Sequence, residues 1–406
     1  MNDSRSAPAT AGRHAFVALV ATLAIQVFTS LAATATAVLA PEIAQAFAIA
    51  PKWIGVFVGL VYAGAMLASL ASGGFIERFG AIRVSQIGVV LCAAGTALIA
   101  VAPAGAEALL VVAALIIGLG YGPITPASSH VLIRTSPPEK LALTFSIKQT
   151  GVPAGAALAG AALPSLALVL GWRHALLIAA ASGLAVGVAA QPARAMLDND
   201  RRPGRPLSIA GIWTALRLVR QSPTLAELVA ISFAYAATQV CLTSFLVVYL
   251  TEALDWTLVG AGLALTLATL GGVVGRIAWG WLADRRVPPR RVLAIIGLIA
   301  ASCSAVTAAA TPSWPTATLL LITLLFGATA IGWNGVQLAE VARRAPAGTA
   351  GTVTGAAGFI TFSGVVAGPP SFALLAAATG SYRVGFAVLA VLSGLCGLAL
   401  LRRRAA

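Results

Sequence analysis

The chain has 406 residues, of which 59% are hydrophobic and 9% are charged, and its formal net charge is +14. A soluble domain carries about 25% charged residues, so this composition excludes a soluble globular protein. The positive charge does not indicate nucleic-acid binding, because the basic residues lie in short loops between apolar blocks. Apolar blocks of about 20 residues cross membranes as helices that satisfy their own backbone hydrogen bonds. We therefore expect a multi-pass membrane protein.

The apolar blocks predict an all-α membrane protein with about 12 transmembrane helices in two pseudo-symmetric six-helix bundles. Residues 1–13 form a polar tail, 14–192 the first bundle, 223–402 the second, and 403–406 a short tail. The first apolar block has no cleavage site after it, so we interpret it as a helix rather than a signal peptide. The predicted spans are 15–39, 53–75, 84–102, 107–132, 142–169, 174–192, 224–250, 257–282, 290–310, 316–340, 350–378 and 382–401.

Residues 193–222 are the long connection between the bundles. A polar stretch at 198–206 precedes apolar residues at helical spacing, with Arg217 and Arg220 beside them. This pattern predicts a cytoplasmic linker whose amphipathic helix lies on the anionic inner leaflet. The apolar residues are Ile209, Ile212, Trp213, Leu216 and Val219.

The basic residues also predict the orientation of the chain. Apart from those inside spans, every Lys and Arg except Lys52, Arg173 and Arg383 lies on one side. Since the basic side faces the cytoplasm, we expect both termini to be cytoplasmic in a plasma membrane. Aromatic residues at the opposite helix ends are typical of an interfacial belt. They are Trp53, Trp172, Tyr249, Trp256, Trp314 and Tyr382.

An internal repeat supports two parallel halves. Residues 73–80 match 280–285 at an offset of 207, and residues 171–173 match 381–383 at an offset of 210. Halves of this kind place a substrate site near the membrane midplane, at their interface. The cysteines lie in apolar spans without CxxC spacing or His partners, so we expect neither a disulfide nor a metal nor another cofactor.

These motifs resemble the major facilitator superfamily, whose loop between the second and third helices usually reads Gly-x-Leu-Ala-Asp-Arg-x-Gly-x-Arg and recurs between the eighth and ninth. The two copies here run from Gly73 to Arg83 and from Gly280 to Arg291, with Glu77 in place of the first Asp. In the second copy, residues 287–289 replace the usual Gly. The resemblance covers essentially the whole chain. It implies a secondary transporter, monomeric and without enzymatic activity.

The acidic residues of the two loops, Glu77 and Asp284, are predicted to gate the transporter together with Arg78 and Arg285. A carboxylate at the inner end of a helix is well placed to accept hydrogen bonds from the positive N-terminus of a neighbouring helix. Glu77 and Asp284 would then latch the inner ends of the two bundles. The alternative is that they are ordinary interfacial charges.

Two cations inside spans are the main candidates for substrate binding. Lys148, followed by Gln149, and Arg276 each lie about six residues from an inner helix end, or about 9 Å deep. Charged groups at such depth are costly and mark functional sites. The alternative is snorkelling, in which a long basic side chain reaches the interface along its helix.

Because no Asp or Glu lies mid-span in the first or fourth helix, the two cations favour an anionic substrate. The pair Gly275-Arg276 is similar to what carboxylate and inorganic-anion branches of the superfamily show. Pro123 and Pro126 are expected to loosen the fourth helix and free carbonyls beside a cavity. Further hydrogen-bonding candidates, each also interpretable as a contact between helices, are Tyr121, Asn334, Gln337, Gln26 and Gln239.

Glu340 and His130 occupy matching positions in the two halves, and either is a candidate proton carrier. Alternatively, Glu340 pairs with Arg343 or Arg344 and His130 fills an interface. The leading interpretation is a secondary transporter of a small anion, a carboxylate by preference, working in the lipid bilayer without nucleic acid. The alternative within transport is efflux of hydrophobic compounds. A nucleotide-driven pump is disfavoured because the chain has no GxxxxGK[ST] loop, and an enzyme is disfavoured because no nucleophiles or acids converge within spans.

Overall fold

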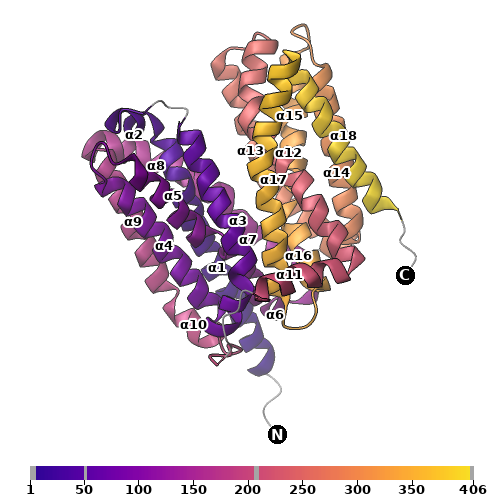
Figure 1. Ribbon diagram of the computed structural model, residues 1–406. Coiled ribbons are helices and arrows are strands. Elements are labelled where there is room, and N and C mark those ends of the chain that lie inside the picture. Colours follow the sequence, from indigo (N-terminus) through magenta and orange to yellow (C-terminus); the bar gives the residue numbers. More distant parts are fainter. Residues whose placement is uncertain (1–5, 50–52, 205–209, 403–406) are drawn as a thin grey trace. The chain divides into compact units, whose positions relative to one another are not determined.

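The computed structural model describes residues 6–49, 53–204 and 210–402, and most of them are helical (Figure 1). Within these residues, twelve helical stretches are long and apolar enough to cross a membrane, which confirms the predicted fold class. The stretches are Gly12–Val38, Gly55–Phe79, Ala81–Val101, Glu107–Thr135, Pro138–Leu170, Trp172–Leu197, Pro223–Ala253, Gly260–Arg285, Pro289–Ala309, Thr316–Arg344, Ala350–Thr379 and Tyr382–Leu401. Lys52, Ile209 and the tail 403–406 lie outside the described residues.

Several of these stretches are assembled from more than one helix. The helices up to the linker are α1 (Ser6–Val38), α2 (Ala40–Ala46), α3 (Trp53–Phe79), α4 (Ala81–Val101), α5 (Glu107–Tyr121), α6 (Ile124–Thr135), the short 3-10 helix η1 (Pro138–Lys140), α7 (Leu141–Gln149), α8 (Gly151–Leu170), α9 (Trp172–Ala189) and α10 (Gln191–Leu197). From the linker onward they are α11 (Ala210–Gln221), α12 (Pro223–Ala253), α13 (Leu258–Arg285), α14 (Pro289–Ala309), α15 (Thr316–Ala330), α16 (Asn334–Arg344), α17 (Ala350–Thr379) and α18 (Tyr382–Leu401).

The chain divides into two compact units. Unit 1 comprises Met1–Pro137, Lys148–Ala226 and Val341–Phe359, and unit 2 comprises Pro138–Ile147, Glu227–Glu340 and Ile360–Ala406. Each unit therefore contains a short segment from the other half of the sequence: most of α7 belongs to unit 2, and the first part of α17 to unit 1. The predicted boundaries at 14–192 and 223–402 stay a prediction.

The fourth and tenth spans are each interrupted at equivalent positions. Gly122 and Pro123 separate α5 from α6, and residues 331–333 separate α15 from α16, at the predicted offset of 210. Pro123 has no N–H to continue the hydrogen-bonding pattern. A Cβ on Gly122 would lie 2.3 Å from the Ala65 carbonyl oxygen, so only glycine allows α3 to approach this closely. The interruptions leave carbonyl groups without a helical donor.

The second and third spans are joined by Gly80 alone, whose φ of +93° favours glycine. The sixth span is longer than the predicted 174–192, because α10 continues it to Leu197. Asp198, the next residue, returns to the start of α4, where its carboxylate accepts hydrogen bonds from the backbone N–H groups of Ile82 (2.8 Å) and Arg83 (3.0 Å). The linker thus begins attached to unit 1.

In unit 2, α7 packs closely against α13 and α16. A Cβ on Gly335 would lie 2.2 Å from the Ser146 hydroxyl oxygen, and one on Gly280 would lie 2.4 Å from the same atom. Ser146 is fully buried. Two glycines therefore allow the contact that holds α7 beside the C-terminal end of α13, where Asp284 lies.

Candidate functional site

Lys148 lies inside unit 1, held by two amide oxygens. Its ammonium nitrogen donates to Oε1 of Gln26, at 2.6 Å, and to Oε1 of Gln149, at 3.0 Å. The side chain is 1% exposed, whereas a lysine that snorkels along the lipid face would be exposed in a chain without its membrane. Gln26 turns its oxygen to the ammonium, which directs its amide N–H groups, both donors, away from Lys148.

The cation also marks a joint between helices, since α7 ends at Gln149 and α8 begins at Gly151. The chain passes from unit 2 to unit 1 between Ile147 and Lys148. Ser30 of α1 donates to the Val152 carbonyl at 2.6 Å, just beyond the joint. Three of the predicted site residues, Lys148, Gln26 and Gln149, are therefore brought together by α1 and the joint of the fifth span.

Arg276 lies inside unit 2, and its side chain is 2% exposed. Its Nε donates to the carbonyl oxygen of Ile331, at 3.0 Å, in the interruption between α15 and α16. The indole of Trp279, one turn later, donates to the Ala328 carbonyl at 2.8 Å. The interrupted tenth span therefore supplies the acceptors that hold α13 and its guanidinium in place.

The same interruption gathers further predicted residues. Trp333 Nε1 and Asn334 Nδ2 both donate to Oε1 of Gln239, at 3.2 and 3.0 Å, and so link α16 to α12. Gln337 donates to the Leu228 carbonyl at 3.4 Å. These bonds are contacts between helices, and a substrate-binding role for Gln239, Asn334 and Gln337 stays a prediction. In unit 1, Tyr121 packs edge-on against Tyr62, with ring centroids 6.3 Å apart.

Asp284 caps the N-terminus of α7. Its two carboxylate oxygens accept from the backbone N–H groups of Ala142, at 2.9 Å, and Leu143, at 2.7 Å. These amides are among those that an α-helix leaves unpaired at its start, and a negative charge there is favoured by the helix dipole. Arg285 lies over the Trp281 ring, 5.4 Å from its centroid. A carboxylate from the eighth span thus holds the start of the fifth.

Glu77 in unit 1 makes a longer contact, with a side-chain hydroxyl instead of backbone N–H groups. Thr352, near the start of α17, donates to its carboxylate at 3.4 Å. The helices approach closely there, because a Cβ on Gly73 would lie 2.4 Å from the Thr352 hydroxyl oxygen. Arg78 lies over the ring of Phe79, 5.3 Å from its centroid.

The start of the linker forms a polar network that composition alone did not reveal. Asp200 accepts from His130 at 2.7 Å and pairs with Arg134 at 2.7 Å, while Asn199 accepts from Arg134 at 2.8 Å. Burial raises the pKa of Asp198, an effect that the N–H groups of Ile82 and Arg83 partly offset. Burial also acts to raise the pKa of Asp200, but the bond from His130 and the charges of His130 and Arg134 outweigh it and hold that pKa low.

The lowered pKa of Asp200 determines how its contribution to stability depends on pH. The contribution of Asp200 is fully present above its ordinary pKa of 3.8 and is lost only as the pH falls through the lower value of the folded state. The attachment of the linker through Asp200 is therefore intact at neutral pH. His130, proposed as a filler or a proton carrier, contacts the linker. Glu340 is buried on α16, one turn before Arg344, and a proton-carrying role for either residue stays a prediction.

Asp198→Ala is expected to loosen the linker, since removal of a helix cap costs about 1 kcal/mol. Tryptic cleavage after the exposed Arg201 should accelerate about fivefold, because proteolysis follows the population of the open segment. Glu139→Ala, which removes an exposed acid in the short 3-10 helix before α7, is the control and should cleave at the wild-type rate. Equal rates for the Asp198 variant and wild type would contradict the capping role.

Comparison with known proteins identifies a family. The family model described as Major Facilitator Superfamily matches residues 22–369. A relative named "Probable nitrate/nitrite transporter NarK2", from Mycobacterium tuberculosis, is 35% identical over 128 residues, which cover 30% of this chain and 31% of that protein. The chain therefore matches less than a third of the length of that relative. An uncharacterized MFS-type transporter of the same organism is 24% identical over 378 residues, covering 92% of this chain and 82% of the relative.

Solved structures agree on the fold. The human organic anion transporter MFSD10 has a TM-score of 0.77 at 17% identity, covering 95% of this chain and 99% of that one. The E. coli fucose:proton symporter FucP has a TM-score of 0.73 at 19% identity, covering 94% of this chain and 97% of that one. At these identities the likeness shows the fold alone.

Proposed function

The chain belongs to the Major Facilitator Superfamily, and on that premise we propose that it is a secondary transporter that moves a small anion across the cytoplasmic membrane. The anion carries a planar oxyanion group, a carboxylate by preference. Transport proceeds by alternating access, in which the two halves of such a protein rock about a fixed site. The protein works as a monomer in the bilayer.

One observation carries the proposal: each unit buries one cation beside an interrupted helix. Lys148 stands at the joint of α7 and α8, and Arg276 is bonded to the interruption between α15 and α16. Burial of a charge is costly, so a membrane protein retains one where it serves a function. The Lys148 ammonium donates to the amide oxygens of Gln26 and Gln149, and the Arg276 guanidinium donates to the Ile331 carbonyl, so neutral oxygen atoms help to orient both cations.

The two cations differ in the oxyanion geometry that each can bind. The guanidinium of Arg276 is a planar fork that matches the two oxygens of a carboxylate or of nitrate, whereas the Lys148 ammonium is a compact point charge. The likeness to a protein named as a nitrate/nitrite transporter supports a small planar oxyanion. Gln26 and Gln149, bonded to Lys148, supply amide donors to the same substrate.

Counterflow into proteoliposomes tests this function directly. We expect one or more small anions from a panel of formate, acetate, pyruvate, succinate and nitrate to be taken up against the same unlabelled anion. Vesicles without protein are the blank. The lipophilic cation tetraphenylphosphonium represents the alternative, efflux of hydrophobic compounds. Counterflow of that cation together with none of the anions would overturn the proposal.

We further propose that Asp284 and Glu77 gate transport. Asp284 bonds the end of α13 to the start of α7, and Glu77 contacts the start of α17. In both cases an acid from the loop motif reaches a helix of the other half of the sequence. Making and breaking these contacts would accompany the alternation of access. Arg78 and Arg285, stacked on neighbouring rings, flank the two acids.

The proposed orientation places both termini in the cytoplasm and the loop at residues 311–315 outside. A cysteine at the exposed position Ser313 is expected to react with an impermeant maleimide in intact cells. Glu139→Cys, exposed in a loop predicted to be cytoplasmic, is the control and should react only after permeabilisation. The reverse pattern would invert the assigned orientation.

A further inference from the structure

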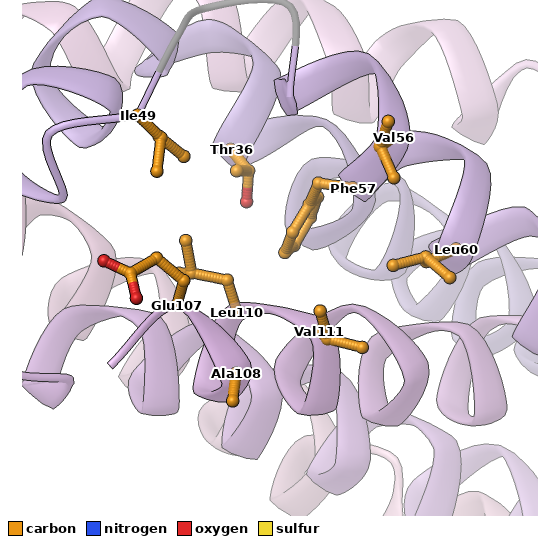
Figure 2. A pocket seen from close by; sticks show the side chains of 9 residues that line it. All are labelled: Thr36, Ile49, Val56, Phe57, Leu60, Glu107, Ala108, Leu110 and Val111. Atoms are coloured by element: carbon orange, nitrogen blue, oxygen red, sulfur yellow. The ribbon is translucent and has the colours of Figure 1, made fainter. Parts of the chain in front are cut away.

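Unit 1 contains a cavity of about 350 Å³ where α1 ends and α3 and α5 begin, at the opposite end of these helices from the linker (Figure 2). Small-molecule sites have volumes of about 300–1,000 Å³. The walls are apolar, and two of their residues carry oxygen atoms in their side chains, Thr36 and Glu107. The principal apolar residues are Ile49, Val56, Phe57 and Leu110.

The Thr36 hydroxyl is a buried polar group that has no hydrogen-bond partner among the residues the structure describes. The residue is 1% exposed. Other threonines of α1 donate to the carbonyl one turn earlier, as Thr29 does to Ile25 at 2.9 Å and Thr34 to Ser30 at 2.8 Å. Figure 2 shows the Thr36 oxygen pointing into the cavity instead. Since an unpaired buried hydroxyl destabilises a protein, a ligand that pairs with it would recover that loss.

Glu107 gives the cavity its charge. It is the first residue of α5 and is exposed, and Figure 2 shows its carboxylate at the edge of the cavity. The position suits a carboxylate because of the helix dipole, which accounts for its place at the helix start. Its place at the rim of an apolar cavity has a further effect, because an ionised carboxylate attracts a cationic group of whatever enters.

We propose that this cavity binds an amphipathic primary amine. The ammonium group pairs with Glu107, the hydrocarbon body lies against Phe57 and Leu110, and a hydroxyl or other polar atom near the ammonium pairs with Thr36. The site is separate from Lys148 and Arg276, so it does not depend on the anion proposed above. Two sources supply this chemistry: a free amphiphilic amine and the aminoethyl headgroup of phosphatidylethanolamine.

Binding is tested on the full chain in phosphatidylcholine nanodiscs, which contain no primary amine. Radiolabelled 2-amino-1-decanol and decylamine are the probes, with empty nanodiscs as the blank. We expect the wild-type protein to bind both probes saturably. Glu107→Gln loses a charge-assisted contact, so its affinity for both probes should fall by about tenfold or more. Glu42→Gln removes an exposed acid near the same membrane end without touching the cavity, and should bind as wild type does.

Thr36→Val distinguishes a ligand site from a packing defect. It should raise the melting temperature of the unliganded protein, because it removes an unpaired hydroxyl, yet weaken 2-amino-1-decanol severalfold while leaving decylamine unchanged. Nanodiscs with phosphatidylethanolamine identify the source: competition indicates the lipid, and unchanged binding indicates a free amphiphile. Binding equal to that of empty nanodiscs, wild-type affinity of Glu107→Gln, or equal affinity for decanoate would each overturn the proposal.

Discussion

Arg276→Ala is expected to weaken binding of the transported anion by about 100-fold or more, with the folded protein still in the membrane. Each charge-assisted hydrogen bond to the anion is worth about 1.5–3 kcal/mol, and a guanidinium makes two to a planar oxyanion. Lys148→Ala should nearly abolish binding as well, because the ammonium is buried and cannot be replaced by water at equal strength. A binding titration on reconstituted protein measures both losses.

Two conservative variants separate charge from geometry. Arg276→Lys keeps the charge but loses the fork, so binding of a carboxylate should weaken by about tenfold or more. Lys148→Met keeps most of the side-chain volume and removes the charge, so it should bind as poorly as Lys148→Ala.

The control is Arg173→Ala, which removes a half-buried arginine that donates to the Ala102 carbonyl at 2.8 Å and has no contact with Lys148 or Arg276 among its described hydrogen bonds. Its melting temperature should fall while its affinity stays at the wild-type value. If Arg276→Ala and Lys148→Ala lose thermal stability in the same way but bind the anion normally, the two cations are structural and the anion hypothesis is wrong.

Asp284→Asn is expected to lower the transport rate about tenfold while the affinity changes by less than about twofold. The amide keeps one acceptor oxygen but turns an N–H₂ group toward the backbone N–H of Ala142 or Leu143, and the favourable charge at the N-terminus of α7 is lost. A contact that differs between conformations alters their populations rather than the substrate site. Initial rates in proteoliposomes and an equilibrium titration give the two quantities.

A second acid of unit 2 serves as the matched control. Glu227 accepts two hydrogen bonds from Arg290, at 2.8 and 3.0 Å, and thereby joins α12 to α14. Glu227→Gln should reduce thermal stability without a comparable loss of rate. An unchanged turnover of Asp284→Asn would remove Asp284 from the gating mechanism, whatever its effect on stability.

The spans were predictable because each is a long apolar block, and hydrocarbon tolerates few structures besides a helix. The weak point of the fourth span was predictable as well, since Pro123 breaks the hydrogen-bonding pattern. Its equivalent between α15 and α16 contains no proline. It consists of Ile331, Gly332 and Trp333, and only the offset of 210 between the halves points to it.

Contacts between segments far apart in the sequence could not be predicted. Lys148 and Arg276 stand out as buried charges, but nothing local indicates that Gln26 or the Ile331 carbonyl holds them. Asp198 reads as one acid in a polar linker, whereas it caps a helix 116 residues earlier. Gly80 was the available indication, because a one-residue connection at a glycine leaves the first N–H groups of α4 in need of an acceptor. For Asp284 the sequence indicated a helix N-terminus as the partner but could not identify α7.

The exchange of segments between the units has a consequence for biogenesis. Residues 138–147 are synthesised with the first half, yet they belong to unit 2, whose other residues begin at Glu227. During synthesis, the first amides of α7 emerge from the ribosome before their acceptor Asp284. Ser146 likewise emerges before Gly280 and Gly335, against which it packs. A polypeptide ending at residue 222 would lack all three partners. The contacts of α7 are therefore complete only once the eighth and tenth spans have been synthesised.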